Sequence, residues 1–378
     1  MKEQIYTNYL LQLPEQELLG TLVVRDGRIA DIQPGVVATG QDGGGEYLLP
    51  GLIELHTDNL ERCLSPRPGV RWPIDAAASN HDRDLAAAGI TTVCDAIAIG
   101  DVTPTSLRTT EFHGMIDEIY DRQQAGKFSV DHRLHLRCEL AFEEVADVVS
   151  QYVEHPLLSL ISLMDHTPGQ RQFAKLDKFR EYYMGKHGVS ADEIEDFIRD
   201  RIEAQKAYAI VSRQALVALA SQHSLAMASH DDATVEHVHQ AVEEGAAISE
   251  FPTTLEAAKE AHAQAMQVLM GAPNLVLGGS HSGNVSALEL AELDLVDLIS
   301  SDYVPHSLLQ SVFVIAAATE KPVHKAMRPV TINPATAIGL AGDRGSLELG
   351  KRADLLTLKL SGTVPILTSV ISQGRRVA

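Results

Sequence analysis

Both ends of the chain carry the alternating or β-branched pattern of residues that is typical of β-strands. An Asp26-Gly27 dipeptide, typical of a hairpin turn, separates two of these runs. The predicted strands are 5–9, 20–24, 28–32, 354–358 and 369–377. Because the runs at the two termini resemble each other, we predict that residues 1–50 and 340–378 together build one small β-domain.

The intervening residues, 51–339, show a different pattern: a short apolar run followed by a helix-like stretch or a loop, many times over. Eight such runs predict strands at 51–56, 90–95, 133–139, 158–165, 225–230, 246–250, 274–280 and 298–302. Eight strand–helix units in series are typical of a closed parallel barrel. The sequence therefore predicts an α/β protein, with a (β/α)8 TIM-type barrel and a small β-domain built from both termini.

Composition and charge narrow the classes of partner. A chain of 378 residues is longer than most single domains, which agrees with a barrel plus a smaller unit. The formal net charge of −20 argues against nucleic acid as a partner, because phosphate backbones bind basic surfaces. A small anionic substrate stays compatible with this charge where Arg, Lys or metal ions reverse the sign locally.

Cysteine usage and the N-terminal residues predict the compartment. The three cysteines, Cys63, Cys94 and Cys138, form no Cys-x-x-Cys pair, so neither a disulfide framework nor a zinc ribbon is indicated. The first residues are too polar for a signal peptide, and the chain has no apolar run of about 18 residues that would span a membrane. We expect a reduced, cytoplasmic protein with no membrane partner.

Polar side chains stand at the ends of several predicted strands, where barrel enzymes carry their catalytic groups. Taken singly, each has an ordinary structural explanation, such as a helix cap or a paired core carboxylate. Their repeated placement at strand ends instead indicates a cage of imidazoles and carboxylates, suited to Zn²⁺, Mn²⁺, Fe²⁺ or Ni²⁺. The candidate metal ligands are His56, Asp58, Glu139, His166, His230 and Asp302.

Two segments carry a resemblance to the amidohydrolase superfamily. Leu49–His56 resembles its first-strand motif, and Gly345–Leu355 resembles its return to the β-domain. The sequence has Asp58 where the superfamily usually has a second histidine, and the fourth strand has no obvious bridging lysine. The resemblance therefore implies that Glu139 is the bridging carboxylate, with Asp165 as the alternative.

Longer motifs resemble one family of this superfamily, the PhnM proteins of the carbon–phosphorus lyase pathway. They are His56–Glu61, Pro66–Pro73, Met164–Phe173, Ser229–Asp232 and Ser249–Thr253. The resemblance implies metal-dependent hydrolysis of α-D-ribose 1-methylphosphonate 5-triphosphate to the 5-phosphate and pyrophosphate. It also implies two divalent ions, with Asp302 as the catalytic proton acceptor.

A phosphorylated sugar substrate requires groups that neutralise or cradle its phosphates. The predicted substrate-binding residues are Arg67, Arg71, Arg171, Lys186, Gly279, His281 and Asn284. Glycine in the 278–284 segment allows the backbone to approach phosphate oxygens closely. We also expect a homo-oligomer. The competing hypotheses are a cyclic amidase or deacetylase on the same barrel, and a non-catalytic barrel that serves as a scaffold.

Overall fold

The computed structural model describes residues 3–101, 106–171, 179–180, 184, 193–280 and 283–378. It divides into two compact units. The first comprises Met1–Asp95, Glu118–Arg133 and Met270–Ala378, and the second Ala96–Asp117 and Leu134–Leu269. The predicted boundaries near residues 50 and 340 separate two sheets rather than these units, and as domain boundaries they stay a prediction.

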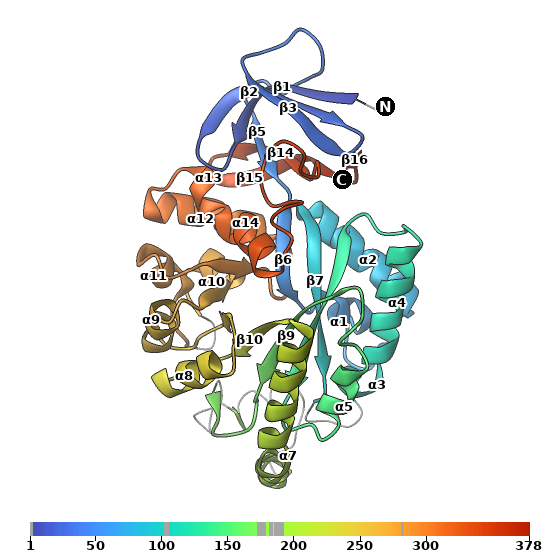
Figure 1. Cartoon of the computed structure of the whole chain (residues 1–378), viewed down its shortest axis with the longest axis vertical. Helices are drawn as coiled ribbons and strands as arrows, with labels where there is room; N and C mark the ends of the chain where they lie inside the picture. The colour runs from blue at the N-terminus through green and yellow to red at the C-terminus, as the bar shows by residue number, and fades with distance from the viewer. Residues whose placement is uncertain (1–2, 102–105, 172–178, 181–183, 185–192, 281–282) are drawn as a thin grey trace. The chain divides into compact units, whose positions relative to one another are not determined.

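The first sheet is built from both termini, and the N and C labels of Figure 1 lie beside it. Its strands run in the order β16-β15-β14-β5-β1-β2-β3, and β4 pairs with β1. They are β1 (Glu3–Gln12), β2 (Glu17–Arg25), β3 (Arg28–Pro34), β4 (Gln41–Asp42), β5 (Tyr47–Pro50), β14 (Leu355–Ser361), β15 (Val364–Ser372) and β16 (Arg375–Arg376). The predicted β2–β3 turn is confirmed, with Asp26 and Gly27 both at positive φ.

The second sheet has eight strands that follow one another in chain order. They are β6 (Leu52–Thr57), β7 (Ile90–Ile99), β8 (Asp131–Glu139), β9 (Leu158–Met164), β10 (Ala226–His230), β11 (Ile248–Glu250), β12 (Gln267–Gly271) and β13 (Leu298–Ser300). β6 and β7 are buried along their whole length, as expected for parallel strands covered on both faces. A parallel bridge between Thr57 and Asp302 connects the first strand to the end of the last, so the predicted barrel is confirmed.

Helices follow the strands of this sheet. They are α1 (Asn59–Leu64), α2 (Ile74–Ala87), α3 (Leu107–Thr110), α4 (Phe112–Gln124), α5 (Val145–Ser150), α7 (Ile194–His223), α8 (Val235–Glu243), α9 (Leu255–Ala263), α10 (Ala272–Leu277), α11 (Ala287–Glu292), α12 (Ser307–Thr319), α13 (Val323–Ala326), the 3₁₀ helix η2 (Arg328–Val330) and α14 (Ile332–Ala337). α8 and α9 begin where the sequence supplies a threonine cap, since Thr234 and Thr254 each accept a backbone N–H of the first turn. No described helix is long and apolar enough to cross a membrane.

The predicted seventh strand, 274–280, is wrong. The strand lies earlier, at β12, and residues 272–277 form α10 instead. A short apolar run does not distinguish a strand from a buried helical turn. Pro273 stands in the first turn of α10, where proline is tolerated, and Gly278 ends the helix with φ at +77°.

The Leu-Pro-Gly-Leu part of the first-strand motif has a steric explanation within the first unit. Gly51 lies between β5 and β6, and its backbone N–H donates to the carbonyl of Asp354 at 2.8 Å. A Cβ atom at Gly51 would overlap the side chain of Thr91 on β7. Only glycine therefore lets the chain pass from the terminal sheet into the first barrel strand at this point.

Candidate metal centre

Three of the predicted ligands belong to the first unit. His56 lies on β6, Asp58 follows that strand, and Asp302 follows β13. The backbone N–H of Asp302 donates to the carbonyl oxygen of His56 at 3.2 Å. Thr57 Oγ1 donates to the carbonyl of Asp302 at 2.8 Å. The structure therefore brings His56 and Asp302 to neighbouring backbone positions.

A buried carboxyl group, that of Glu54 on β6, reinforces the contact between His56 and Asp302. Its Oε1 accepts the backbone N–H of His56 at 2.7 Å, and its Oε2 accepts that of Ser301 at 2.5 Å. Burial raises the pKa of Glu54 to about 8, and the hydrogen bonds from Ser301 and His56 oppose that shift. Asp302, next to Ser301, has φ at +54°, a conformation that costs a non-glycine residue energy unless its surroundings enforce it.

The other three predicted ligands belong to the second unit and lie at consecutive strand ends. Glu139 ends β8, His166 follows β9 and His230 ends β10. Glu139 Oε2 lies 2.8 Å from His166 Nδ1. Asp231 connects the two histidines, because its Oδ2 lies 3.7 Å from His166 Nε2 and 2.9 Å from His230 Nδ1. Within this unit the structure brings Glu139, His166 and His230 together.

The sequence interpretation missed two acids in this cluster, Asp231 and Glu250. Glu250 is the last residue of β11, and its Oε2 lies 3.7 Å from His230 Nε2. Both acids also stand at strand ends, so the criterion that selected the other candidate ligands could have selected them. Asp231 follows β10 directly, and its φ of +55° turns the chain at that point.

Opposite charges adjust the protonation of this cluster. Burial alone lowers the pKa of His230, but the carboxylates of Asp231 and Glu250 outweigh it, so the pKa is raised. Burial tends to raise the pKa of Asp231, but His230 and then His166 outweigh it, so that pKa is lowered. An ionised carboxylate together with imidazoles is a set of donors that divalent metals bind.

The chemistry of these donors fits a divalent ion. One donor atom from each of His166, His230 and Asp231 lies within 4.8 Å of the others. His230 and Asp231 are buried and His166 is partly buried, so water competes little for the ligand positions. Oxygen and nitrogen donors of this kind match zinc, manganese, iron and nickel alike.

The predicted substrate-binding residues have different surroundings. Arg67 and Arg71 are exposed in the loop after α1, and Arg71 Nη1 donates to Ser65 Oγ at 3.0 Å. Gly279 and Asn284 are partly buried and follow α10, not a strand as predicted. Lys186 and His281 lie outside the described residues.

Arg171 is buried, and part of its guanidinium has a structural role. Its Nη1 donates to the carbonyl of His230 at 2.8 Å and to Asp232 Oδ1 at 2.5 Å. Asp232 also accepts hydrogen bonds from the hydroxyls of Ser229 and Ser249. Arg171 therefore holds the chain that follows β10, and a contact with substrate stays a prediction.

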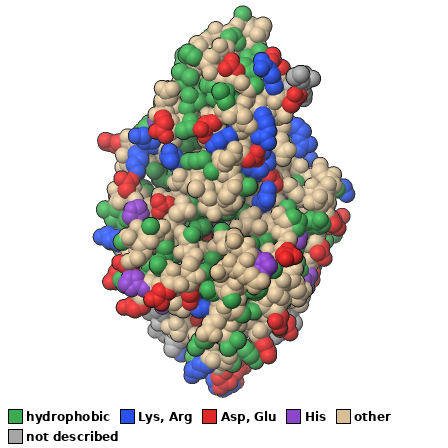
Figure 2. Space-filling model, viewed as in Figure 1, with side chains coloured by type: hydrophobic (Ala, Val, Ile, Leu, Met, Phe, Trp, Pro, Cys, Tyr) green, Lys and Arg blue, Asp and Glu red, His purple; other side chains and the backbone are tan. Residues whose placement is uncertain are grey.

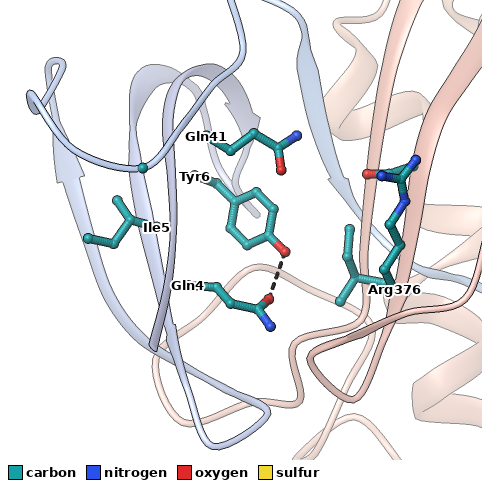
Figure 3. A pocket seen from close by; sticks show the side chains of 8 residues that line it. Gln4, Ile5, Tyr6, Gln41 and Arg376 are labelled. Atoms are coloured by element: carbon teal, nitrogen blue, oxygen red, sulfur yellow. Dashed lines mark hydrogen bonds between the residues drawn. The ribbon is translucent and has the colours of Figure 1, made fainter. Parts of the chain in front are cut away.

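A cavity of about 370 Å³ lies in the terminal sheet, lined by residues that include Gln4, Tyr6, Gln41 and Arg376 (Figure 3). Its polar side chains are bonded within the protein. Tyr6 donates to Gln4 Oε1 at 2.9 Å, and Gln41 donates to the hydroxyl of Tyr9 at 2.7 Å. Because these groups are already paired and no metal-ligand pattern lines the cavity, the strand-end residues are the better candidate site.

Comparison with solved structures shows which proteins share the fold. The chain covers 100% of its length against N-isopropylammelide isopropylaminohydrolase from Burkholderia multivorans (98% of that chain, 14% identity, TM-score 0.66). All of the chain also aligns with N-acetylglucosamine-6-phosphate deacetylase from Pasteurella multocida (100% of that chain, 14% identity, TM-score 0.62). An amidohydrolase at 16% identity gives a TM-score of 0.64 over 99% of its chain. These likenesses show the fold alone: a barrel with a small β-domain, as in these hydrolases.

Sequence comparison identifies the family. The chain is 44% identical over 378 residues to α-D-ribose 1-methylphosphonate 5-triphosphate diphosphatase from Escherichia coli K12, covering 99% of this chain and 100% of the relative. The chain belongs to the family of this enzyme, as the motifs in the sequence predicted. No family model matches the chain.

Proposed function

We propose that the protein is a metal-dependent diphosphatase that hydrolyses α-D-ribose 1-methylphosphonate 5-triphosphate to the 5-phosphate and pyrophosphate, in phosphonate catabolism. The full-length identity of 44% to the E. coli enzyme that bears this name carries the proposal. The strand-end residues support it, because hydrolysis of a phosphoanhydride requires an activated water and neutralisation of the leaving group.

The proposed ligands of the metal centre are His56, Asp58, Glu139, His166, His230 and Asp302, and we add Asp231 from its contacts with both histidines. Bound divalent ions would supply positive charge beside the phosphoanhydride and make water more acidic. Glu139 and Asp231 orient the imidazoles by accepting their N–H groups or by sharing the ion with them. Glu139 is the proposed bridging carboxylate.

Asp302 is the proposed catalytic residue. Water adds to phosphorus, the phosphoanhydride P–O bond breaks, and pyrophosphate leaves with the electron pair. The carboxylate of Asp302 accepts the proton that the water loses. Its backbone is held on both sides, by the bonds to the carbonyl of His56 and the hydroxyl of Thr57, so the segment that carries the base is fixed before substrate arrives.

Binding of the anionic substrate is assigned to cationic and backbone groups. Arg67 and Arg71 are exposed and placed after β6, in the loop where barrel enzymes bind substrate. Figure 2 shows Lys and Arg among Asp and Glu over the visible face, rather than one continuous basic surface. This distribution suits a small substrate better than a nucleic acid. Arg171, Lys186, Gly279, His281 and Asn284 complete the proposed set.

The remaining parts of the proposal concern the ions and the assembly. We propose two ions of zinc, manganese, iron or nickel, a cytoplasmic location and a homo-oligomer. Ile210 and Val211 support an oligomer, since both lie on α7 with 68% and 67% of their surface exposed.

Metal removal combined with the Asp302→Asn variant tests the function. Chelation should abolish release of pyrophosphate by the wild type, and divalent ions should restore it. Asp302→Asn, loaded to the same metal content, should release pyrophosphate at least a hundredfold more slowly, within the range that loss of a general base costs. Wild-type rates in the loaded variant would disprove the role of Asp302, and full activity after chelation would disprove the metal mechanism.

A further inference from the structure

A second buried cluster of titratable side chains lies outside the proposed metal centre, within the first unit. We call it the Asp95 network; its members are Asn59 on α1, His81 and Asp82 on α2, Asp95 on β7 and His132 on β8, each at most 3% exposed. Asp95 Oδ1 lies 2.6 Å from His81 Nε2, and Asp95 Oδ2 lies 2.7 Å from His132 Nδ1. His81 Nδ1 lies 3.2 Å from Asn59 Nδ2.

The carboxylate of Asp95 can only accept hydrogen bonds, so it fixes which atoms donate in the Asp95 network. His81 donates through Nε2, so in the neutral ring Nδ1 is an acceptor. Nδ1 can then accept only from the amide nitrogen of Asn59, which fixes the orientation of that amide. The side chain of Asn59 is therefore held by a specific tautomer of His81, and that tautomer is selected by Asp95.

The far end of the network is anchored to the backbone. Asp82 Oδ1 accepts the N–H groups of Ser129 and Val130 at 2.8 and 3.0 Å. It also lies 3.4 Å from His132 Nε2. His132 thus stands between two carboxylates, an arrangement that favours the protonated imidazolium form.

One donor atom from each of His81, Asp95 and His132 lies within 4.8 Å of the others, so these residues could also hold a metal ion. Both oxygens of Asp95 lie within 2.7 Å of a ring nitrogen, which is a hydrogen-bond distance. In the structure the donors of the network are hydrogen-bonded to each other, and their contacts lead to Asn59, so we assign the network a positioning role.

The near end of the network connects to the proposed centre. Asn59 is the first residue of α1, directly after Asp58, which occupies the N-cap position of that helix without a side-chain cap bond. The backbone N–H of Asn59 donates to Thr57 Oγ1 at 3.3 Å. That same hydroxyl donates to the carbonyl of Asp302. A continuous set of hydrogen bonds therefore leads from Asp95 to the segment that holds Asp58 and Asp302.

We propose that His81 and Asp95 are positioning residues, which hold Asn59 and thereby the segment that carries the metal-binding residue Asp58. The inference rests on the proposed function for the role of Asp58. His81 and Asp95 are not among the proposed ligands or substrate-binding residues, and they act by fixing the first turn of α1.

Titration of the full-length protein with Mn²⁺ alone tests the inference, with kcat and KM for pyrophosphate release measured in parallel. His81→Leu should weaken Mn²⁺ binding by about tenfold to a hundredfold, as loss of an outer hydrogen-bond partner does. His81→Gln should restore it, because the amide offers one acceptor to Asn59 and one donor to Asp95. Asn59→Ala should weaken binding to a similar extent, and the double variant should be no weaker than either single variant.

The control separates positioning from lost stability. Asp131→Asn removes a buried charge elsewhere in the first unit, and should lower stability while leaving Mn²⁺ affinity within twofold. Unchanged affinity in both His81→Leu and Asn59→Ala, or additive losses in the double variant, would overturn the inference. If His81→Leu fails to fold, Asn59→Ala and His81→Gln still decide the question. Wild-type protein that binds Mn²⁺ without hydrolysing the triphosphate would instead disprove the proposed function alone.

Discussion

A buried carboxylate at the start of β8, Asp131, joins the barrel to the returning C-terminal segment of the first unit. Its Oδ2 accepts from the guanidinium groups of Arg344 and Arg352, the latter at 2.9 Å. Its Oδ1 accepts from Gln123 Nε2 at 2.9 Å. Arg352 belongs to the Gly345–Leu355 segment that identifies the superfamily, so this ion cluster explains part of that motif.

Asp131→Asn keeps the size of the side chain and removes its charge. The exposed fractions of the side chains of Asp131, Arg344 and Arg352 are 6%, 5% and 9%, so water does not replace the lost carboxylate. Breaking a buried ion pair by removing one partner costs about 3–5 kcal/mol, and the lower end applies here because Arg344 keeps Asp343 and Arg352 keeps Asp354. That loss is a large part of the roughly 5–15 kcal/mol by which proteins are stable.

Urea unfolding of metal-free wild type and variant measures this loss. The matched control is Asp343→Asn, which removes another acid bonded to Arg344. The side chain of Asp343 is 33% exposed, so its loss should cost no more than about 1 kcal/mol. Equal losses in the two variants would refute the reasoning, because burial would then not decide the energy of the ion cluster.

Three further predictions concern single residues. Glu54→Gln should weaken metal binding roughly tenfold or more in a chelator competition assay, because the backbone N–H of His56 or of Ser301 then faces an amide donor. Unchanged affinity would show that Glu54 does not hold His56 and Asp302 in place. Asp231→Asn should weaken metal binding by at least as much in the same assay, and wild-type affinity would remove Asp231 from the centre. Burial favours neutral His132, but Asp95 and Asp82 outweigh it and raise its pKa to about 9. Its contribution to stability is thus complete below about pH 6.5 and lost as the pH rises through about 9, so the stability deficit of His132→Phe should shrink over that range; a growing deficit would contradict this.

Most of the fold follows from local patterns in the sequence. Buried runs such as 51–56 and 90–95 are apolar enough to identify parallel strands, and Asp26-Gly27 identifies a hairpin. The run 274–280 does not show its helical period because its apolar residues are too few, and Pro273, just before it, lies in the first turn of the helix. A local sequence pattern predicts an element well when the residues that determine it are close together in the chain.

The site was predicted in part, for a physical reason. Strand-end position selects His56 and His230 as candidate ligands, because the barrel gathers such ends. The contacts of Glu54 with Ser301, and of Asp95 with His81 and His132, join residues that are distant in the sequence. No periodicity records such pairs, so their role appears only in the folded chain.

Phosphorus NMR of the metal-loaded protein with ribose 1-methylphosphonate 5-triphosphate tests the central claim most directly. The account predicts pyrophosphate and the 5-phosphate in equal amounts, which places cleavage between the α and β phosphorus atoms. Release of orthophosphate would move the scissile bond and contradict the diphosphatase. An unchanged triphosphate, with the ions bound, would contradict the phosphoanhydride substrate and favour an amide or ester on the same barrel.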